Sequence, residues 1–159
     1  MRKLFFIALV AIAAISAKAQ TNFSGTYVIN KSKIDFGKAP EWVLPSAFEV
    51  VQNGDKLTIS RTTVDQAGKE TTRKLDFQPG QATDYTTSSG DKNECLVAWA
   101  GDHSSFTLSV QSTKADGSAG QNYKEVWSLA DNGHTLIIDR QVAQANGMKY
   151  AIKAVYDKK

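Results

Sequence analysis

The sequence predicts an all-β protein, an antiparallel up-and-down β-barrel of about eight to ten strands. Apolar and polar residues alternate through most segments after residue 22, as in strands with one buried and one solvent-facing side. Short turns rich in Gly, Asn and Asp separate these segments, and only residues 31–36 suggest a turn of helix. Hairpin-sized connections favour a meander over a Greek key, and closure into a barrel removes the exposed sheet edges.

The clearest strands lie near the C-terminus, at Gln121–Leu129, His134–Val142 and Met148–Tyr156. Asp131-Asn132-Gly133 and Asn146-Gly147 join them, and residues of these types tolerate the positive φ that a tight reversal needs. The residues that share one face are Tyr123, Glu125, Trp127 and Leu129, then Leu136, Ile138, Arg140 and Val142, then Met148, Tyr150, Ile152, Ala154 and Tyr156.

The earlier part of the chain has the same character, with a break between the first two strands. The strands expected there are Phe23–Asn30, Phe48–Gln52, Lys56–Val64, Lys69–Phe77, Thr83–Ser88, Asn93–Trp99 and Ser105–Thr113. Gly25 in the first strand marks a point of close packing. Residues 31–36 either extend that strand or form a short turn of helix.

The segment from Gly37 to Ser46 is expected to be a loop, because Pro40 and Pro45 bracket the short stretch Glu41-Trp42-Val43-Leu44 within it. It carries Trp42 together with Val and Leu, side chains that should be hidden. One interpretation is a lid whose apolar residues pack over the open end of the barrel. The other is that this loop gates a ligand, since loops at such positions often carry function.

The N-terminus has the features of a secretory signal peptide at residues 1–19. Arg2-Lys3 precede an apolar run, and Ala17-Lys18-Ala19 fits a signal peptidase site before Gln20. The run is shorter than the roughly 20 apolar residues that span a membrane. We therefore expect one domain, residues 20–159, secreted or periplasmic, with no membrane span after cleavage.

Charge and cysteine content exclude some classes of protein. Three of the 19 basic residues lie in the predicted signal peptide, which leaves 16 basic and 16 acidic residues. A chain without net charge has no electrostatic footprint for nucleic acid or anionic membrane. The single cysteine, Cys95, excludes an intrachain disulfide. Its position on a strand face favours a buried small hydrophobe over a reactive thiol.

Charged residues interrupt several faces that are otherwise apolar. A buried charge costs several kcal/mol unless it is paired, so Glu125 and one or two arginines should meet if these faces point inward. The alternative is that one arginine stays partly free and binds an anionic head group, because guanidinium matches carboxylate geometry. The charged residues concerned are Arg61, Arg73, Glu125 and Arg140.

The anchor hypothesis places Arg61 or Arg140 with Tyr150 at the carboxylate of an apolar ligand. Tyr123 adds a second hydroxyl donor. The candidate ligand-binding residues are therefore these four charged residues and four aromatic ones, Tyr123, Tyr150, Trp127 and Trp42.

No group of residues assembles into a catalytic or metal site. His103 and His134 both lie beside turns, and neither stands at metal-ligand spacing with a Cys, Asp or second His. No nucleophile elbow or phosphate-binding glycine loop is present. We therefore expect no enzyme activity, no cofactor and no metal.

Three short patterns resemble the calycin barrels, the group of lipocalins and fatty-acid-binding proteins. Phe23-Ser24-Gly25-Thr26-Tyr27 is similar to their Gly-x-Trp start, with Tyr27 in the Trp position. The later Arg140 strand and the closing Tyr150–Tyr156 strand are also similar, as is Glu125–Leu129 before Asp131-Asn132-Gly133 in small exported bacterial lipocalin-like proteins. The resemblance implies a lipocalin-like barrel with a small-molecule cavity, and Arg140 packed across Tyr27.

These observations lead to two hypotheses for function. The first is an exported lipocalin-like protein, a monomer or weak dimer, that binds a small apolar or amphipathic ligand, anionic in one version, in the barrel. The alternative is a protein-interaction module, such as an inhibitor or envelope accessory factor, whose barrel is filled by its own side chains. Inward aromatics sufficient for that are Phe77, Trp99, Phe106, Trp127 and Tyr150. Cavity volume distinguishes the two.

Overall fold

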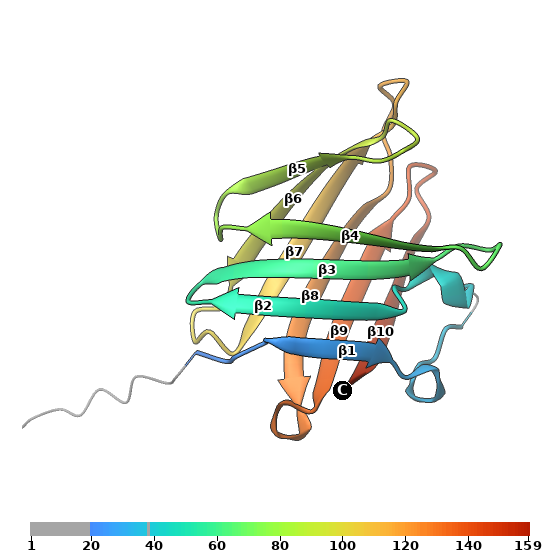
Figure 1. Cartoon of the computed structure of the whole chain (residues 1–159). Helices are drawn as coiled ribbons and strands as arrows, with labels where there is room; N and C mark the ends of the chain where they lie inside the picture. The colour runs from blue at the N-terminus through green and yellow to red at the C-terminus, as the bar shows by residue number, and fades with distance from the viewer. Residues whose placement is uncertain (1–19, 38) are drawn as a thin grey trace, which may run out of the picture.

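The computed structural model describes residues 20–37 and 39–159, so the predicted signal peptide lies outside the described residues. Within them, ten antiparallel strands form one sheet that curls into a nearly closed barrel (Figure 1). The strands are β1 (Gly25–Ile29), β2 (Ala47–Asn53), β3 (Lys56–Val64), β4 (Glu70–Phe77), β5 (Ala82–Thr86), β6 (Lys92–Trp99), β7 (Ser105–Thr113), β8 (Asn122–Ala130), β9 (Thr135–Ala143) and β10 (Lys149–Lys158). Short 3-10 helices are η1 (Lys31–Lys33), η2 (Glu41–Val43) and η3 (Asp131–Gly133).

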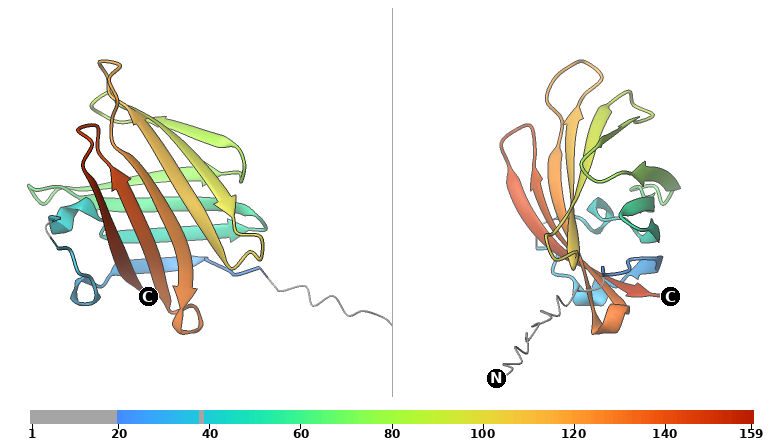
Figure 2. Two further views of the ribbon diagram at one scale, coloured as in Figure 1. Left: turned by 180° about the vertical axis from the view of Figure 1, so that it is seen from behind. Right: turned by 90° about the vertical axis from the view of Figure 1, so that its left-hand side faces the viewer.

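The predicted up-and-down topology is confirmed. The sheet order is β4-β3-β2-β1-β10-β9-β8-β7-β6-β5, so neighbours in sequence pair and β1 also pairs with β10. The two free edges, on β4 and β5, lie next to each other without a hydrogen-bonded ladder, and we call this gap the seam (Figure 1). Figure 2 shows β1–β4 crossing one side of the barrel and β6–β10 forming the other.

Successive strands run in opposite directions, so successive connections lie alternately at one end of the barrel and at the other. The β1–β2, β3–β4, β5–β6, β7–β8 and β9–β10 connections lie at one end, which we call the mouth end. The start of β1, the end of β10 and the remaining turns lie at the other end.

The alternation that predicted the strands also predicted their inward faces. On β8, Glu125 and Trp127 are buried, whereas Lys124, the residue before Glu125, is exposed. On β9, Ile138 and Arg140 are buried and Asp139 is exposed. Burial with a period of two residues, as along most of these strands, follows because successive side chains project to opposite sides of the sheet.

Aromatic side chains fill much of the interior. The largest with at most 1% exposure are Phe23, Tyr27, Phe48, Phe106, Trp127 and Tyr156. Trp127 stacks on Phe106 at 5.1 Å between ring centroids and meets the edge of Phe48 at 4.7 Å. These separations lie within the range of favourable aromatic pairs.

The predictions for one turn and for Gly25 in the first strand are confirmed. Asp131, Asn132 and Gly133 adopt φ values of 51°, 55° and 87°, as a tight reversal there requires. Gly25 lies against the side chain of Lys158, which a Cβ atom at that position would strike. Gly25 therefore marks the close packing that the sequence predicted.

The loop between β1 and β2 begins with η1, so residues 31–33 form a short turn of helix. Leu44 is 4% exposed and Val43 packs against the core, but Trp42 is 49% exposed. The expectation that all the apolar residues of this loop are hidden is therefore wrong for Trp42. Three consecutive residues of a single 3-10 turn cannot all point inward, and Trp42 is the one that points out.

Among the described residues, no helix is long and apolar enough to cross a membrane.

Candidate functional site

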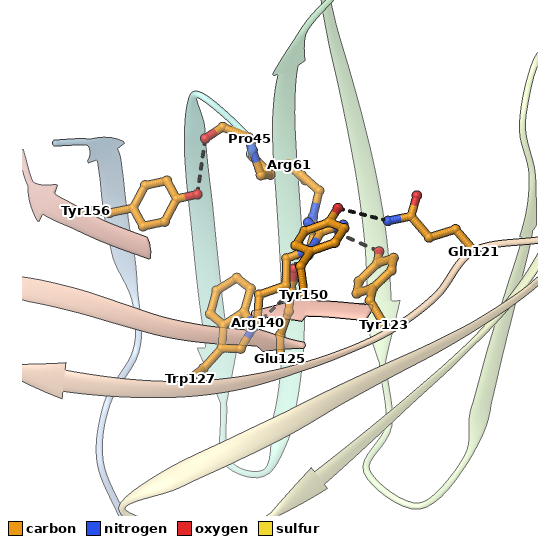
Figure 3. A network of polar contacts seen from close by, with 9 residues as sticks. All are labelled: Pro45, Arg61, Gln121, Tyr123, Glu125, Trp127, Arg140, Tyr150 and Tyr156. Atoms are coloured by element: carbon orange, nitrogen blue, oxygen red, sulfur yellow. Dashed lines mark hydrogen bonds and ion pairs between the residues drawn. The ribbon is translucent and has the colours of Figure 1, made fainter. Parts of the chain in front are cut away.

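A buried cluster of three charged side chains crosses the centre of the barrel (Figure 3). Glu125, 1% exposed, receives a hydrogen bond from Arg61 Nη2 at 2.6 Å and from Arg140 Nη1 at 3.2 Å. Trp127 Nε1 donates to the same carboxylate at 3.1 Å. The prediction that Glu125 and one or two arginines meet is confirmed, with Arg61 and Arg140 as the partners.

Strand register and barrel curvature together assemble this cluster. Glu125 on β8 lies directly opposite Arg140 on β9, so their side chains share one inward face. Arg61 lies on β3, which is not adjacent to β8 in the sheet, and its long side chain reaches across the interior. The first contact follows from sequence register, and the second from closure of the barrel.

The cluster carries more positive than negative charge. Two guanidiniums share one carboxylate, and Arg140 Nε is buried without a hydrogen-bond partner in the described part of the chain. The Arg140 guanidinium lies 4.2 Å from the ring centroid of Tyr123, a cation–π contact that partly offsets its desolvation. The interior is thus suited to a further anionic group.

Burial and charge act in opposite directions on Glu125. Burial by itself would raise the pKa of this carboxyl, but Arg61 and Arg140 outweigh it and hold the pKa below its ordinary value of 4.5. The carboxylate is therefore ionised wherever the protein is folded at neutral pH.

We predict an acid-dependent loss of stability that originates at Glu125. Its pKa is lower in the folded than in the unfolded chain, so its contribution is complete above about pH 4.5 and disappears as the pH falls through the folded-state value. Urea unfolding of the wild type and of Glu125→Gln should therefore differ most near pH 7 and converge in acid. The other carboxyl groups are the same in both proteins, so their effects cancel in the difference between the two free energies of unfolding. If that difference stayed constant between pH 7 and about pH 3, the prediction would be wrong.

The remaining predicted polar residues surround the cluster at separate positions. Tyr123 accepts a long hydrogen bond, 3.4 Å, from Arg61 Nη1, and burial raises its pKa to about 12. The hydroxyl of Tyr150 accepts from Gln121 Nε2 at 3.4 Å (Figure 3). Arg73 makes none of these contacts and lies over the ring of Tyr85 at 4.2 Å.

Two expectations about aromatic residues meet different outcomes. Trp127 lies in the aromatic core with 0% exposure, where it supports Glu125. The expected packing of Arg140 across Tyr27 is wrong, because the cation over Tyr27 is Lys158, at 5.6 Å. Register explains the difference, since Tyr27 pairs with Lys158 at the end of β10, whereas Arg140 pairs with Ile152 nearer its start.

Cys95 is 2% exposed and burial raises its pKa to about 11, which makes it the buried small hydrophobe expected. Its side chain lines a cavity of about 30 Å³ beneath the seam. That cavity matches the volume of about one water molecule. Within the described residues, therefore, the space beneath the seam is too small to enclose a lipid-sized ligand.

A larger pocket lies at the mouth end, between the β1–β2 loop and the start of β10, and we call it the mouth pocket. Its volume is about 490 Å³, within the range of roughly 300–1,000 Å³ typical of ligand sites. It exists because β1 pairs with β10 only from Tyr156 to Lys158, which leaves the first half of β10 without a strand on that side. The large apolar residues that line it are Phe36, Trp42, Val43, Met148 and Ile152, with Tyr150 beside them.

Sequence reasoning identified Trp42 and Tyr150 in this pocket but not Phe36 or Met148. Met148 is 57% exposed directly after the Asn146-Gly147 turn. An apolar residue at such an exposed turn was the available signal. Phe36 gave no signal of its own, because its role depends on how the loop folds back on β10.

Neither a family model nor a curated protein matches this sequence. Solved structures are nevertheless similar in fold, and the chain takes the form of a calycin-type β-barrel. The REP1-NXSQ fatty acid transporter is similar with a TM-score of 0.57 and 15% identity, over 86% of this chain and 95% of that one.

Two further structures lead to the same fold. The zebrafish ileal bile acid-binding protein in complex with cholic acid is similar with a TM-score of 0.54 and 19% identity, over 86% of this chain and 98% of that one. Lipid binding protein 8 of Caenorhabditis elegans is similar with a TM-score of 0.58 and 13% identity, over 86% and 95%. At identities this low, the similarity shows a shared fold alone.

Proposed function

We propose that this protein is an exported carrier that binds a small, largely apolar molecule in the mouth pocket. The observation that carries the proposal is a pocket of about 490 Å³ with a mainly apolar wall, at the mouth end of the barrel. The fold supports it, because the structural neighbours are named as a fatty acid transporter, a bile acid-binding protein and a lipid-binding protein. Their names describe binding rather than catalysis.

The walls of the mouth pocket suit an elongated apolar molecule. Phe36 and Val43 pack against the core on one side, and Ile152, 4% exposed, forms the inner wall. Trp42 and Met148 are largely exposed at the rim, where a bound molecule would cover them. Removing apolar surface of this kind from water contributes about 25 cal/mol per Å², against which the entropic cost of binding acts.

Charge beneath the pocket favours a ligand with an anionic group. Ile152 in the pocket wall pairs in register with Arg140, and the buried cluster behind it has two guanidiniums for one carboxylate. The anchor formed by Arg61 or Arg140 with Tyr150 stays a prediction. It requires that a long-chain carboxylate bind more tightly than the matching neutral alcohol.

Trp42→Ala should weaken binding of a fluorescent long-chain fatty acid by about tenfold, which corresponds to about 1.4 kcal/mol. The lost contact area of a half-exposed Trp accounts for an effect of this size. Titration followed by ligand fluorescence measures it.

Leu96→Ala is the matched control, because Leu96 is a 42% exposed apolar residue on the outer face of β6. It should leave the affinity unchanged. Equal loss in both variants, or no loss in Trp42→Ala, would remove the mouth pocket from the proposal.

The filled interior favours a second candidate function, a protein-interaction module without a small-molecule ligand. The supporting observation is the cavity of only about 30 Å³ inside the barrel. Native mass spectrometry of the protein from its own host separates the two functions. A stoichiometric co-purifying lipid supports the carrier, and an unliganded mass that a panel of lipophilic anions leaves unshifted supports the interaction module.

The proposed export has its own test. N-terminal sequencing of protein from the periplasm or culture fluid should begin at Gln20. An intact N-terminus on a cytoplasmic protein would remove export from the proposal and leave ligand binding to be judged separately.

A further inference from the structure

The seam between β4 and β5 is closed by side chains and not by a strand ladder. Thr83 Oγ1 on β5 donates to the Asp76 carbonyl on β4 at 3.0 Å. Nearer the mouth end, the Arg73 guanidinium lies over the ring of Tyr85 at 4.2 Å. Of these residues, Arg73 and Tyr85 line the cavity of about 30 Å³.

Two arginines face this cavity from adjacent strands. Arg61 on β3 and Arg73 on β4 lie directly opposite each other on the inward face, an arrangement in which like charges repel. Arg61 shares Glu125 with Arg140, and Arg73 forms no ion pair with any described residue. Three guanidiniums therefore face the interior with one carboxylate among them.

The neighbouring elements supply no further negative charge to this cavity. Asp84 on β5 and Glu94 on β6 occupy exposed, outward positions. The polar groups that β5, β6 and β8 turn inward here are neutral, and they are the Tyr85 hydroxyl, the Cys95 thiol and the Tyr123 hydroxyl. The rest of the lining is apolar, namely Ile59, Leu75, Phe77, Leu108 and Val110.

We propose that the cavity beneath the seam is a binding site for a small monovalent anion, held between Arg61 and Arg73. A halide or the carboxylate end of an organic acid has the required size, because the cavity holds about one water-sized group. Charge-assisted hydrogen bonds from the two guanidiniums offset the dehydration of the anion in an apolar wall. This site is separate from the mouth pocket, with which it shares no lining residue.

Cys95 provides a built-in reporter, because it is the single cysteine of the chain and lines the cavity. The rate at which a small neutral reagent, methyl methanethiosulfonate, modifies Cys95 should fall when bromide or acetate occupies the site. At an anion concentration ten times the dissociation constant, the rate should fall about elevenfold, the ratio expected from mass action. Ionic strength is held constant with sulfate.

Arg73→Met should reduce this protection to less than about twofold, whereas Lys74→Met should keep it in full. Lys74 is the matched control because it is the exposed neighbour of Arg73 on the same strand. Arg73→Lys retains the charge and should retain part of the protection. The ratio of rates with and without anion is compared within each variant, which cancels any change in the reactivity of the thiol.

Anomalous diffraction from crystals soaked in bromide gives a second, direct readout. A bromide peak between Arg61 and Arg73 in the wild type, absent in Arg73→Met, is expected. Absence of both the peak and the protection in the wild type would overturn the proposal.

The same assay distinguishes the two sources of anion. Protection by bromide and acetate but not by hexadecanoate identifies a free-anion site, and much stronger protection by hexadecanoate identifies the head group of a lipid. Trp42→Ala should leave Cys95 protection by acetate unchanged. Failure of the anion site is therefore distinguishable from failure of the mouth pocket.

Discussion

Replacing Glu125 with glutamine should lower the free energy of unfolding by about 3–5 kcal/mol, the largest single-residue effect that the charged cluster predicts. The change leaves the buried Arg140 guanidinium and the partly buried Arg61 guanidinium without a counter-charge. Glutamine has the same shape and still accepts from Trp127 Nε1, so the loss reports the charge and not the packing. Urea unfolding at pH 7 measures it.

Two further variants show whether the loss comes from the unpaired charges. Glu94→Gln removes an exposed carboxylate from the outer face of β6 and should change the free energy of unfolding by less than about 0.5 kcal/mol. Replacing the whole cluster with apolar residues, Arg61→Met with Glu125→Leu and Arg140→Met, should recover most of the stability. If Glu125→Gln were no more destabilising than Glu94→Gln, Arg61 and Arg140 would be compensated in some other way.

Trp127→Ala should lower the free energy of unfolding by about 3–5 kcal/mol, as for large aromatic residues in other cores. Trp127 is fully buried, stacks on Phe106, meets Phe48 edge-on and donates its indole hydrogen to Glu125. Alanine would leave a cavity and remove one of the three donors to that carboxylate. Chemical denaturation is again the measurement.

Trp42→Ala supplies the contrast, because the same deletion at a 49% exposed position should cost less than about 1 kcal/mol of stability. Trp127 would then act in the stability of the core and Trp42 in ligand binding. Similar stability losses at both positions would mean that the β1–β2 loop is part of the cooperative core.

The fold was accessible from the sequence because each strand carries its own alternation and most turns carry their own turn residues. The segments Lys56–Val64 and Ser105–Thr113 were predicted with the bounds that the structure has. Strand ends elsewhere differ by a few residues, since hydrogen-bonded pairing ends where a partner strand ends. Phe23, for example, is buried and precedes β1 without belonging to it.

The site was accessible only in part, because its contacts depend on barrel closure. The Glu125–Arg140 pair follows from a hairpin register, which the turn at Asp131–Gly133 sets. That Arg61 and not Arg73 reaches Glu125 depends on the distance across the barrel, which no local pattern encodes. The mouth pocket likewise arises because β10 is longer than β1, so part of β10 has no strand on the side of β1.

The pairing of β1 with β10 has a consequence for how the chain folds. Asn30 and Asp157 are hydrogen-bonded across the junction although they are 127 positions apart in sequence. Joining such distant segments carries a large loop-closure entropy and gives the barrel a high contact order, which slows folding. Hairpins from β2 to β9 are local and can form early, so ring closure is expected as the final step. Because the start of β1 lies beside the end of β10 there, a circular permutant that links these two strands and opens the β7–β8 hairpin would turn this long-range contact into a local one.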